Sequence, residues 1–339
     1  MPHLAVMGAG GWGTALSIVA ARAGREVRLW SRNTKVVDEI NREHVNSAYL
    51  APHEIPSSVQ ASADVDEVVS GAEIVILAAP SHATRELLAR LRDLVEPETV
   101  FVSATKGVEI ETGQRISEIV SDVLDGRPAA RRFVCLSGPS FAQEVAAGQP
   151  TAVVAASADE TLSRAVQSAL SAQNFRVYTN GDVVGTELGG ASKNVMALAA
   201  GMVSGLGLGT NSVAALVTRG LAEMSRLAIA EGARAETLMG LAGLGDLVLT
   251  CTGSLSRNRY VGQELGRGRA LEEVLAGMSE VAEGIRTARA VQLLAGRAGV
   301  EMPITNEVCA VLYEGRSARG AVESLMSRPP RDEFAGYAG

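Results

Sequence analysis

Two lysines stand where a cation could take part in chemistry, and the first is Lys193. It lies in ELGGASKNVMALAAG, where it is the only ionisable side chain after Glu187. The residues around it on both faces of a helix of this sequence are apolar or small. A lysine in such a helix reaches solvent at an edge, pairs with an acid, or lines a crevice where its charge is used. The pattern favours a proton-transferring lysine, and a structural lysine that extends to solvent stays the alternative.

The second lysine is Lys106, in SATKG. A free lysine amine has a pKa near 10.4, so only about one molecule in 2,500 is neutral at pH 7. A lysine base therefore needs burial or a nearby cation, and Lys106 could be that cation for Lys193. An ordinary surface lysine is the alternative for Lys106. The four histidines disfavour a histidine base, because none lies near Lys193 in the sequence; they are His3, His44, His53 and His82.

A glycine-rich turn near the amino terminus points to a dinucleotide. The segment LAVMGAGGWGTAL places Gly8, Gly10 and Gly13 in the spacing G-x-G-x-x-G, after a predicted strand and at the start of a predicted helix. Gly8 permits the tight turn, Gly10 lets a pyrophosphate approach the backbone, and Gly13 lets the helix pack closely on the strand. A glycine-rich turn without a ligand is the alternative, which the position and flanks make the weaker one.

The end of the second predicted strand bears on which dinucleotide binds. NAD-binding units usually carry an acidic residue there, but VRLWSRN supplies Ser31, Arg32 and Asn33. A guanidinium can pair with the 2′-phosphate of NADP. The sequence therefore predicts NADPH over NADH, with a solvated surface arginine as the alternative for Arg32.

Two further constellations lie downstream. Asp246 and Thr250 stand one helical turn apart in GLGDLVLTC, and Asp246 is either a functional carboxylate or a helix cap. In SRNRYVG, Ser256 can cap a helix whose first turn carries Arg257 and Asn258. Helix amides together with a guanidinium make a phosphate site. A merely basic helix is the alternative.

The elements that must position these residues fall into two halves. Up to about residue 181, short apolar runs of β-forming residues alternate with amphipathic stretches of helical length, which predicts a doubly wound α/β domain with a largely parallel sheet. The predicted strands are 3–7, 26–31, 73–79, 99–103, 133–136, 151–156 and 176–179. The predicted helices between them are 14–23, 34–42, 82–95, 113–124 and 160–172, with 46–58 as an irregular loop.

Strand patterns stop after about Gly185, and helical patterns follow at 186–206, 211–231, 257–266, 270–276, 284–298 and 304–313. We therefore predict a Rossmann dinucleotide-binding domain over 1–184 and an all-α substrate and catalytic domain over 185–328. Residues 329–339, with two prolines and little to pack, are expected to form a flexible tail. The length of 339 residues suits two domains.

Composition excludes several classes of protein. A formal net charge of −7 argues against a protein that coats nucleic acid or an anionic membrane. The longest apolar run, 195–208, is broken by glycines and is shorter than the roughly 20 residues that a membrane span needs. We expect no signal peptide and no stable membrane insertion. The three scattered cysteines, Cys135, Cys251 and Cys309, predict neither a disulfide framework nor a metal site, and suit a reducing cytoplasm.

Seven motifs occur in order along nearly the whole chain: GAGGWGTAL, SATKGVE, SGPSFAQEV, ELGGASKNVMALAAG, GLGDLVLTC, SRNRYVG and VAEGIRT. Together they resemble bacterial NAD(P)-dependent glycerol-3-phosphate dehydrogenases. The resemblance implies reversible reduction of dihydroxyacetone phosphate to sn-glycerol 3-phosphate with NADPH or NADH, for phospholipid synthesis. It also implies a cytoplasmic homodimer that acts on a small phosphorylated substrate.

The resemblance also implies roles for particular residues. Lys193 would be the general acid and base, with Lys106, Asn194, Asp246 and Thr250 around the reacting end of the substrate. Substrate contacts would be Lys106, Gly138, Ser140, Lys193, Asp246, Ser256, Arg257 and Asn258. Cofactor contacts would be Gly8, Gly10, Gly11, Trp12, Gly13, Arg32, Lys106, Ala142, Arg257, Val281 and Glu283. Gly11 departs from the serine that is frequent in the family, which loosens one expected contact with the pyrophosphate.

Two rival functions remain open from the residues. Dehydrogenases of β-hydroxyacids or ketopantoate also join a Rossmann unit to a helical domain with a lysine, but their substrates carry a carboxylate in place of a phosphate. A non-enzymatic sensor that binds NADP and a partner protein is the second rival, because a fold alone does not fix a function. Such a sensor would not need Lys106, Lys193, Asp246 and Arg257 together.

Overall fold

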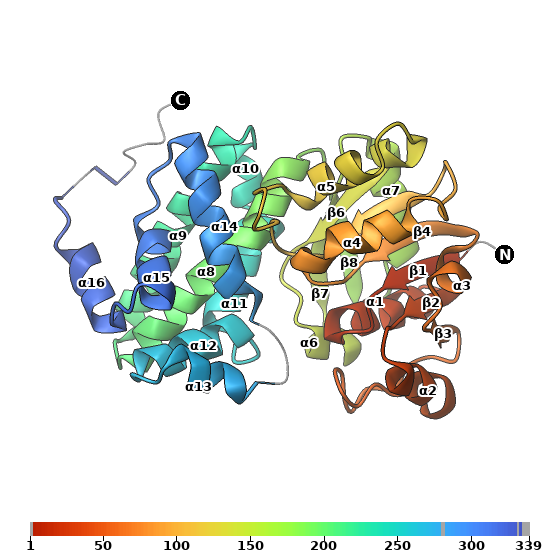
Figure 1. Cartoon of the computed structure of the whole chain (residues 1–339), viewed down its shortest axis with the longest axis horizontal. Coiled ribbons are helices and arrows are strands. Elements are labelled where there is room, and N and C mark those ends of the chain that lie inside the picture. The colour runs from red at the N-terminus through yellow and green to blue at the C-terminus, as the bar shows by residue number, and fades with distance from the viewer. Residues whose placement is uncertain (1–2, 279–281, 331, 334–339) are drawn as a thin grey trace. The chain divides into compact units, whose positions relative to one another are not determined.

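The computed structural model describes residues 3–278, 282–330 and 332–333, and its contacts divide the chain into two units. The first unit comprises Met1–Lys106 and Gln114–Thr186. The second comprises Gly107–Gly113 and Glu187–Gly339, so the segment that follows Lys106 belongs with the helical part of the chain. Both units are shown in Figure 1.

An eight-stranded sheet forms the centre of the first unit, in the order β3-β2-β1-β4-β5-β6-β7-β8 (Figure 1). Neighbouring strands are parallel except for β6 and β7, which pair antiparallel. The strands are β1 His3–Met7, β2 Val27–Trp30, β3 Val59–Ser62, β4 Ala72–Leu77, β5 Val100–Ser103, β6 Phe133–Ser137, β7 Thr151–Ala156 and β8 Phe175–Asn180. The mostly parallel doubly wound sheet is confirmed, and its last two strands run opposite to the rest.

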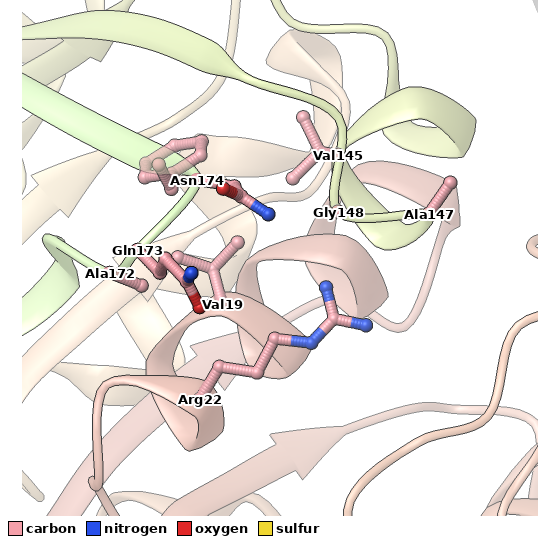
Figure 2. Close-up of a pocket in the computed structure, with 9 residues that line it drawn as sticks. Val19, Arg22, Val145, Ala147, Gly148, Ala172, Gln173 and Asn174 are labelled. Carbon is pink, nitrogen blue, oxygen red and sulfur yellow. The ribbon is translucent and has the colours of Figure 1, made fainter.

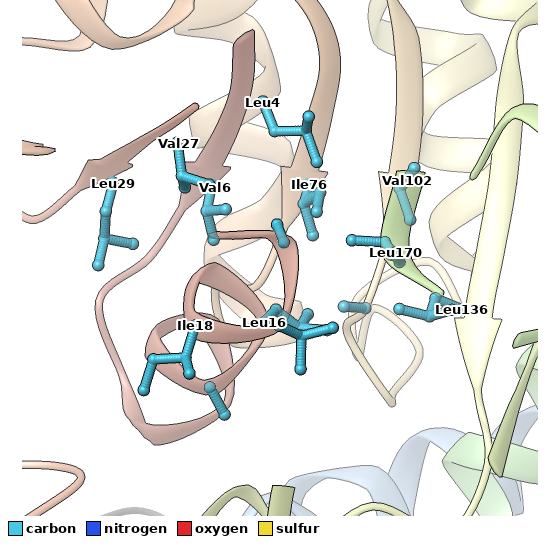
Figure 3. Packing of buried hydrophobic residues seen from close by; sticks show 14 of the residues in the cluster. Leu4, Val6, Leu16, Ile18, Val27, Leu29, Ile76, Val102, Leu136 and Leu170 are labelled. Atoms are coloured by element: carbon cyan, nitrogen blue, oxygen red, sulfur yellow. The ribbon is translucent and has the colours of Figure 1, made fainter. Parts of the chain in front are cut away.

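Helices cover both faces of this sheet. Leu4 and Val6 of β1 and Ile76 of β4 pack toward Leu16 and Ile18 of helix α1 (Figure 3). The alternate side chains of the same strands belong to a second buried cluster with α3, α4 and α5. Strands covered on both faces read as continuous apolar runs, which is why they could be predicted. The helices are α1 Gly11–Arg22, α2 Thr34–Glu43, α3 Val65–Val69, α4 Ser81–Leu91, α5 Ile116–Val123, η1 Pro128–Arg131, α6 Ala142–Ala146 and α7 Glu160–Leu170.

Strand β3 lies inside a stretch for which no element was predicted. It is a four-residue edge strand in which only Val59 and Ala61 are buried. A short strand with one covered face carries too few apolar residues to stand out from a loop, so its pattern in the sequence is weak. The short helices α3 and α6 were missed for the same reason of length.

Long helices form the second unit. Helix α8 is buried almost throughout from Leu188 to Val203, which explains why its sequence is apolar all round. All six helices predicted in this half are confirmed, and α10, the π-helical turn η2, α11 and α16 add to them. The helices are α8 Val183–Gly205, α9 Thr210–Ala230, α10 Ala235–Leu238, η2 Leu241–Gly245, α11 Asp246–Thr252, α12 Arg257–Gly266, α13 Leu271–Ala276, α14 Glu283–Ala298, α15 Pro303–Tyr313 and α16 Ala318–Met326.

No single helix in the described part of the chain is long and apolar enough to cross a membrane. One bent pair of helices, Ala235–Thr252 with Arg257–Gly266, meets the length and composition criterion together. Most of the tail predicted over 329–339 lies outside the described residues, since only 329–330 and 332–333 are described.

Candidate functional site

The glycine-rich turn of the first unit has the shape of a dinucleotide cradle. Gly8 has a φ of +128°, which a residue with a side chain rarely adopts. A Cβ on Gly13 would lie 1.9 Å from the carbonyl oxygen of Gly8, so only glycine allows α1 to pack this closely on β1. A Cβ on Gly10 would meet nothing within 4 Å, so the turn is open on that side. Gly10 is therefore approachable at the amino end of α1, where a pyrophosphate binds best.

Three other residues of the first unit fit a bound NADP. The indole Nε1 of Trp12 is buried and has no hydrogen-bond partner in the described structure, so this N–H beside the turn can donate to a ligand. Arg32 is exposed just beyond β2 and makes no hydrogen bond or ion pair with any described residue. Ala142 lies against the turn, since its Cβ is 3.7 Å from the place of a Cβ on Gly11. These residues suit a dinucleotide, and its bound form would supply or accept the hydride.

Asn46 holds the irregular loop against this turn and was missed in the sequence. Its side chain is fully buried, and Nδ2 donates to the carbonyl oxygen of Ala9 at 3.0 Å and to Oγ1 of Thr14 at 2.9 Å. The same loop brings the carbonyl oxygen of Tyr49 to 3.0 Å from the place of a Cβ on Gly11. A serine at position 11 would thus need the loop to shift. An isolated asparagine in a loop offered no signal for either contact.

Lys106 lies close to two of the predicted substrate contacts. Its Nζ donates to the carbonyl oxygen of Gly138 at 2.8 Å and is 3.5 Å from Oγ of Ser140. These residues follow β5 and β6, whose carboxyl ends lie at the same edge of the sheet as the glycine-rich turn. Oγ1 of the preceding Thr105 donates to Ala79 beyond β4, which fixes the approach of the loop. In open α/β sheets, ligands bind at this edge.

Lys193 forms the centre of the predicted residues in the second unit. Its Nζ lies 2.5 Å from Oδ1 of Asp246 and donates to Oγ1 of Thr250 at 2.9 Å. Lys193 is 7% exposed and Asp246 is fully buried. Of the three arrangements open to a lysine in an apolar helix, the structure shows the pair with an acid. Asp246 follows the N-cap of α11, Gly245, and its side chain meets Lys193 rather than capping the helix.

The hydroxyl of Thr250 completes this group. Its Oγ1 donates to the carbonyl oxygen of Asp246 at 2.6 Å, so it can accept from Lys193. The neighbouring Cys251 is not a candidate nucleophile, since burial raises the pKa of its thiol to about 12. A buried ion pair with a fixed hydroxyl can hold a proton at one defined position.

The turn that begins α12 has the predicted cap. Oγ of Ser256 accepts from the backbone N–H of Arg259 at 3.2 Å. Arg257 is exposed in the first turn, whereas Asn258 is buried. Nδ2 of Asn258 donates to Oδ1 of Asn194 at 3.0 Å, which connects this turn to α8 beside Lys193. Among the predicted cofactor contacts, Glu283 is the first residue of α14, and Val281 lies outside the described residues.

A separate cavity of about 440 Å³ in the first unit contains none of these residues (Figure 2). It lies at the other end of α1 from the glycine-rich turn, where Val19 and Arg22 face the loop around Asn174. No group of three or more His, Cys, Asp or Glu within residues 3–278, 282–330 and 332–333 could hold a metal ion.

A dinucleotide cradle on a doubly wound sheet, followed by a helical unit with a buried lysine–aspartate pair, defines a class of protein: the nicotinamide-dependent dehydrogenases. The family model of the NAD-dependent glycerol-3-phosphate dehydrogenase N-terminus matches residues 3–163, and that of the C-terminus matches residues 182–323. The chain is 53% identical over 335 residues to a glycerol-3-phosphate dehydrogenase (NAD(P)+) of Koribacter versatilis, covering 98% of this chain and 99% of that one. This chain belongs to the NAD-dependent glycerol-3-phosphate dehydrogenase family.

Solved structures agree with this assignment. The crystal structure of glycerol-3-phosphate dehydrogenase from Coxiella burnetii superposes with a TM-score of 0.92 at 41% identity, covering 96% of this chain and 99% of that one. A ketopantoate reductase from Ralstonia eutropha has a TM-score of 0.57 at 17% identity, covering 94% of this chain and 99% of that one. The rival class of keto-acid dehydrogenases therefore shares the fold alone.

Proposed function

We propose that Lys193 is the general acid and base of a glycerol-3-phosphate dehydrogenase reaction. The chain is an NAD(P)-dependent enzyme that reversibly reduces dihydroxyacetone phosphate to sn-glycerol 3-phosphate, the backbone of glycerophospholipids. The observation that supports the role of Lys193 is its buried pair with Asp246. An amine in this pair is shielded from bulk water and still carries a transferable proton.

The proton chemistry follows from the charges. A nicotinamide held by the glycine-rich turn would supply a hydride to the carbonyl carbon of the substrate, so negative charge would grow on the carbonyl oxygen. Lys193 in its ammonium form donates a proton to that oxygen, which completes the alcohol. Lys106, a cation in the first unit, stabilises the developing alkoxide. In the reverse direction, the neutral amine of Lys193 takes the hydroxyl proton.

Asp246 and Thr250 prepare Lys193 for this step. The carboxylate of Asp246 offsets the charge of the buried ammonium, and Oγ1 of Thr250 fixes the direction of a second N–H. When Lys193 has given up its proton, Asp246 remains as a buried carboxylate without its counter-charge. That state is costly, so it favours return of a proton to Lys193 before the next turnover.

The remaining predicted residues bind rather than react. We assign the phosphate of the substrate to Arg257 at the capped amino end of α12 and the adenosine 2′-phosphate of NADP to Arg32. Asn194 belongs with the residues around the reacting end of the substrate, and the other substrate contacts are Gly138, Ser140, Ser256 and Asn258. The other cofactor contacts are Gly8, Gly10, Gly11, Trp12, Gly13, Lys106, Ala142, Arg257, Val281 and Glu283.

We further propose that the enzyme is a cytoplasmic homodimer. The three cysteines, Cys135, Cys251 and Cys309, are buried and unpaired, which suits a reducing compartment. Light scattering on a size-exclusion column checks the assembly. A mass equal to that of one 35.2 kDa chain at micromolar concentration would contradict the dimer.

An oxidation assay tests the function as a whole. The absorbance of NADPH should fall when dihydroxyacetone phosphate is added to the purified enzyme, and small keto acids such as ketopantoate should leave it unchanged. Repeating the assay with NADH measures the cofactor preference, for which we expect the larger kcat/KM with NADPH. Turnover of a keto acid but not of dihydroxyacetone phosphate would overturn the assignment of the substrate.

A further inference from the structure

Helix α14 begins without a capping side chain of its own. Its N-cap is Ala282, whose methyl side chain has no oxygen to accept from the amides of the first turn, although its backbone oxygen accepts from the N–H of Ile285 at 3.2 Å. Those amides have no partner within the helix, and leaving one buried without an acceptor is costly. The first residue of α14 is Glu283, the predicted cofactor contact, so the order of this turn bears on cofactor binding.

An asparagine of another helix supplies the missing cap. Oδ1 of Asn258, in the first turn of α12, accepts from the backbone N–H of Gly284 at 2.9 Å. Gly284 is the second residue of α14, the position at which an N-cap oxygen ordinarily accepts. The cap of α14 is therefore provided by the residue next to Arg257, the predicted phosphate contact.

The carboxamide of Asn258 has one orientation in this arrangement. An amide N–H only donates, so the atom that faces Gly284 must be the oxygen. Nδ2 then donates to Oδ1 of Asn194 at 3.0 Å, and Asn194 directly follows Lys193 on α8. Asn258 and Asn194 are 8% and 5% exposed, so little water competes for these bonds.

Glycine is required at position 284 for this contact. A Cβ there would lie 2.7 Å from the backbone oxygen of Asn194 and 2.7 Å from Oδ1 of Asn258. The first of these is a backbone atom of a buried helix, which cannot move aside easily. Any side chain at this position must therefore push the start of α14 away from α8 and α12.

We propose that Asn258 and Gly284 form a relay that couples binding of the substrate phosphate to binding of the cofactor. A phosphate held by Arg257 fixes the turn that carries Asn258, Asn258 fixes the first turn of α14, and that turn presents Glu283 to the cofactor. The relay rests on the proposed function, which assigns phosphate and cofactor to Arg257 and Glu283. Gly284 is a positioning residue, because it acts through Asn258 and Glu283.

The relay predicts reciprocal coupling between the two ligands. Glycerol 3-phosphate and NADPH are both reduced and do not react, so the two can be titrated together. Saturating glycerol 3-phosphate should lower the Kd of NADPH for the wild-type enzyme by about fivefold or more. In Gly284→Ala the factor should fall to about one, measured by the fluorescence of NADPH.

Gly296→Ala is the matched control. Gly296 lies on the same helix α14, is exposed, and a Cβ there would meet nothing within 4 Å. This variant should keep the wild-type coupling factor and lose no thermal stability, since alanine favours a helix. A wild-type factor of one, or an unchanged factor in Gly284→Ala, would overturn the relay while dihydroxyacetone phosphate is still turned over. A wild-type enzyme that neither turns over dihydroxyacetone phosphate nor binds glycerol 3-phosphate would overturn the proposed function as well.

A second set of variants separates coupling from simple capping and does not depend on the folding of Gly284→Ala. Asn258→Ala removes the remote cap, and adding Ala282→Ser gives α14 a cap of its own. The double variant should regain part of the thermal stability lost in Asn258→Ala, since the bond to Asn194 stays absent. It should not regain the coupling factor, measured as the ratio of the Kd of NADPH without and with saturating glycerol 3-phosphate. Recovery of both would show that Asn258 only caps the helix, and the relay would be wrong.

Discussion

The two units hold Lys106 and Lys193 in different surroundings. Lys106 in the first unit is half-buried and donates to the carbonyl oxygen of Gly138 and approaches Oγ of Ser140, which are neutral oxygens. Lys193 in the second unit is buried, and its Nζ lies 2.5 Å from a carboxylate oxygen of Asp246. The first lysine therefore lies close to water, whereas the charge of the second is offset by a carboxylate inside the protein.

This difference suits the two lysines to different tasks. An ammonium at the carboxyl edge of the sheet can stabilise a developing alkoxide through its positive charge. A buried ammonium paired with a carboxylate forms a neutral unit, and it can pass on a proton and regain it. Under the proposed function, charge is the requirement at position 106, and a proton that can leave is the requirement at position 193.

The largest effect on turnover is expected when Lys193 is replaced, and this change separates the need for a transferable proton from the need for a charge. Lys193→Met should lower kcat by about 10²- to 10⁴-fold, because general acid/base catalysis is lost, and it should leave the Kd of NADPH nearly unchanged. Lys193→Arg should lose turnover almost as fully, since a guanidinium keeps the charge but does not deprotonate. Steady-state kinetics and an NADPH titration measure both quantities.

Lys106→Arg is the comparison for this experiment. It keeps a cation on Gly138 and Ser140, so it should retain far more activity than Lys193→Arg. Equal losses in the two arginine variants would show that the two lysines share one role. Wild-type turnover in Lys193→Met would remove Lys193 from the chemistry.

A smaller effect is expected for the phosphate contact of the second unit. Arg257→Ala should raise the KM for dihydroxyacetone phosphate by about ten- to a hundredfold, because a charged hydrogen bond is worth roughly 1.5 to 3 kcal/mol. The Kd of NADPH alone should change less. The exposed Arg164 of α7 pairs only with Glu160 in the described structure, and Arg164→Ala is a suitable control. An unchanged KM in Arg257→Ala would exclude its phosphate role.

In the first unit, the arginine expected to bind a phosphate is Arg32, and the phosphate belongs to the cofactor. Arg32→Ala should lower kcat/KM for NADPH by about tenfold and leave that for NADH nearly constant, because only NADP carries the 2′-phosphate. High salt should reduce the wild-type preference, since an exposed charge pair is screened. If the ratio of the two kcat/KM values stays the same in Arg32→Ala, another group reads the phosphate.

Much of the fold could be predicted because local patterns carried it. The strands of the sheet centre are apolar on both faces, and α8 is apolar all round, so each stands out within a short window of sequence. The cap on α12 was also predicted, because Ser256 and the amide that it accepts from lie three residues apart. Signals of this kind need no knowledge of distant residues.

Contacts between distant residues could not be obtained in this way. The sequence indicates that Lys193 needs a partner, but the residue that meets it is 53 positions away, on a helix that follows a π-helical turn with two glycines. The bond from Gly284 to Asn258 depends on the packing of two helices against a third. The antiparallel pairing of β7 likewise depends on tertiary packing, since its apolar run resembles those of its parallel neighbours.

A second buried carboxylate of the helical unit extends the comparison to stability. Glu223 on α9 is 2% exposed and accepts from the backbone N–H groups of Ile304 and Thr305 at the start of α15, at 2.6 and 3.3 Å. Asp246 meets a cation, whereas Glu223 meets amides, and burial raises the pKa of Glu223 from 4.5 to about 7. The folded protein then holds a proton that the unfolded chain releases above pH 4.5. The free energy of unfolding should therefore fall between pH 4.5 and about 7, by at most about 1.4 kcal/mol per pH unit, and level off above.

Glu223→Gln should remove this fall, because glutamine stays neutral at every pH in the window. Urea unfolding at pH 5 and pH 7 measures the difference in both proteins, and kcat at pH 7 should be the same, since Glu223 has no part in the proposed chemistry. Glu272→Gln on α13, where the side chain is exposed, controls for the general loss of one acid. An equal pH dependence in wild type and Glu223→Gln would show that the amides of α15 stabilise the carboxylate as fully as water does. In that case the N–H groups at the start of a helix would stabilise the buried carboxylate of Glu223 as fully as Lys193 stabilises that of Asp246.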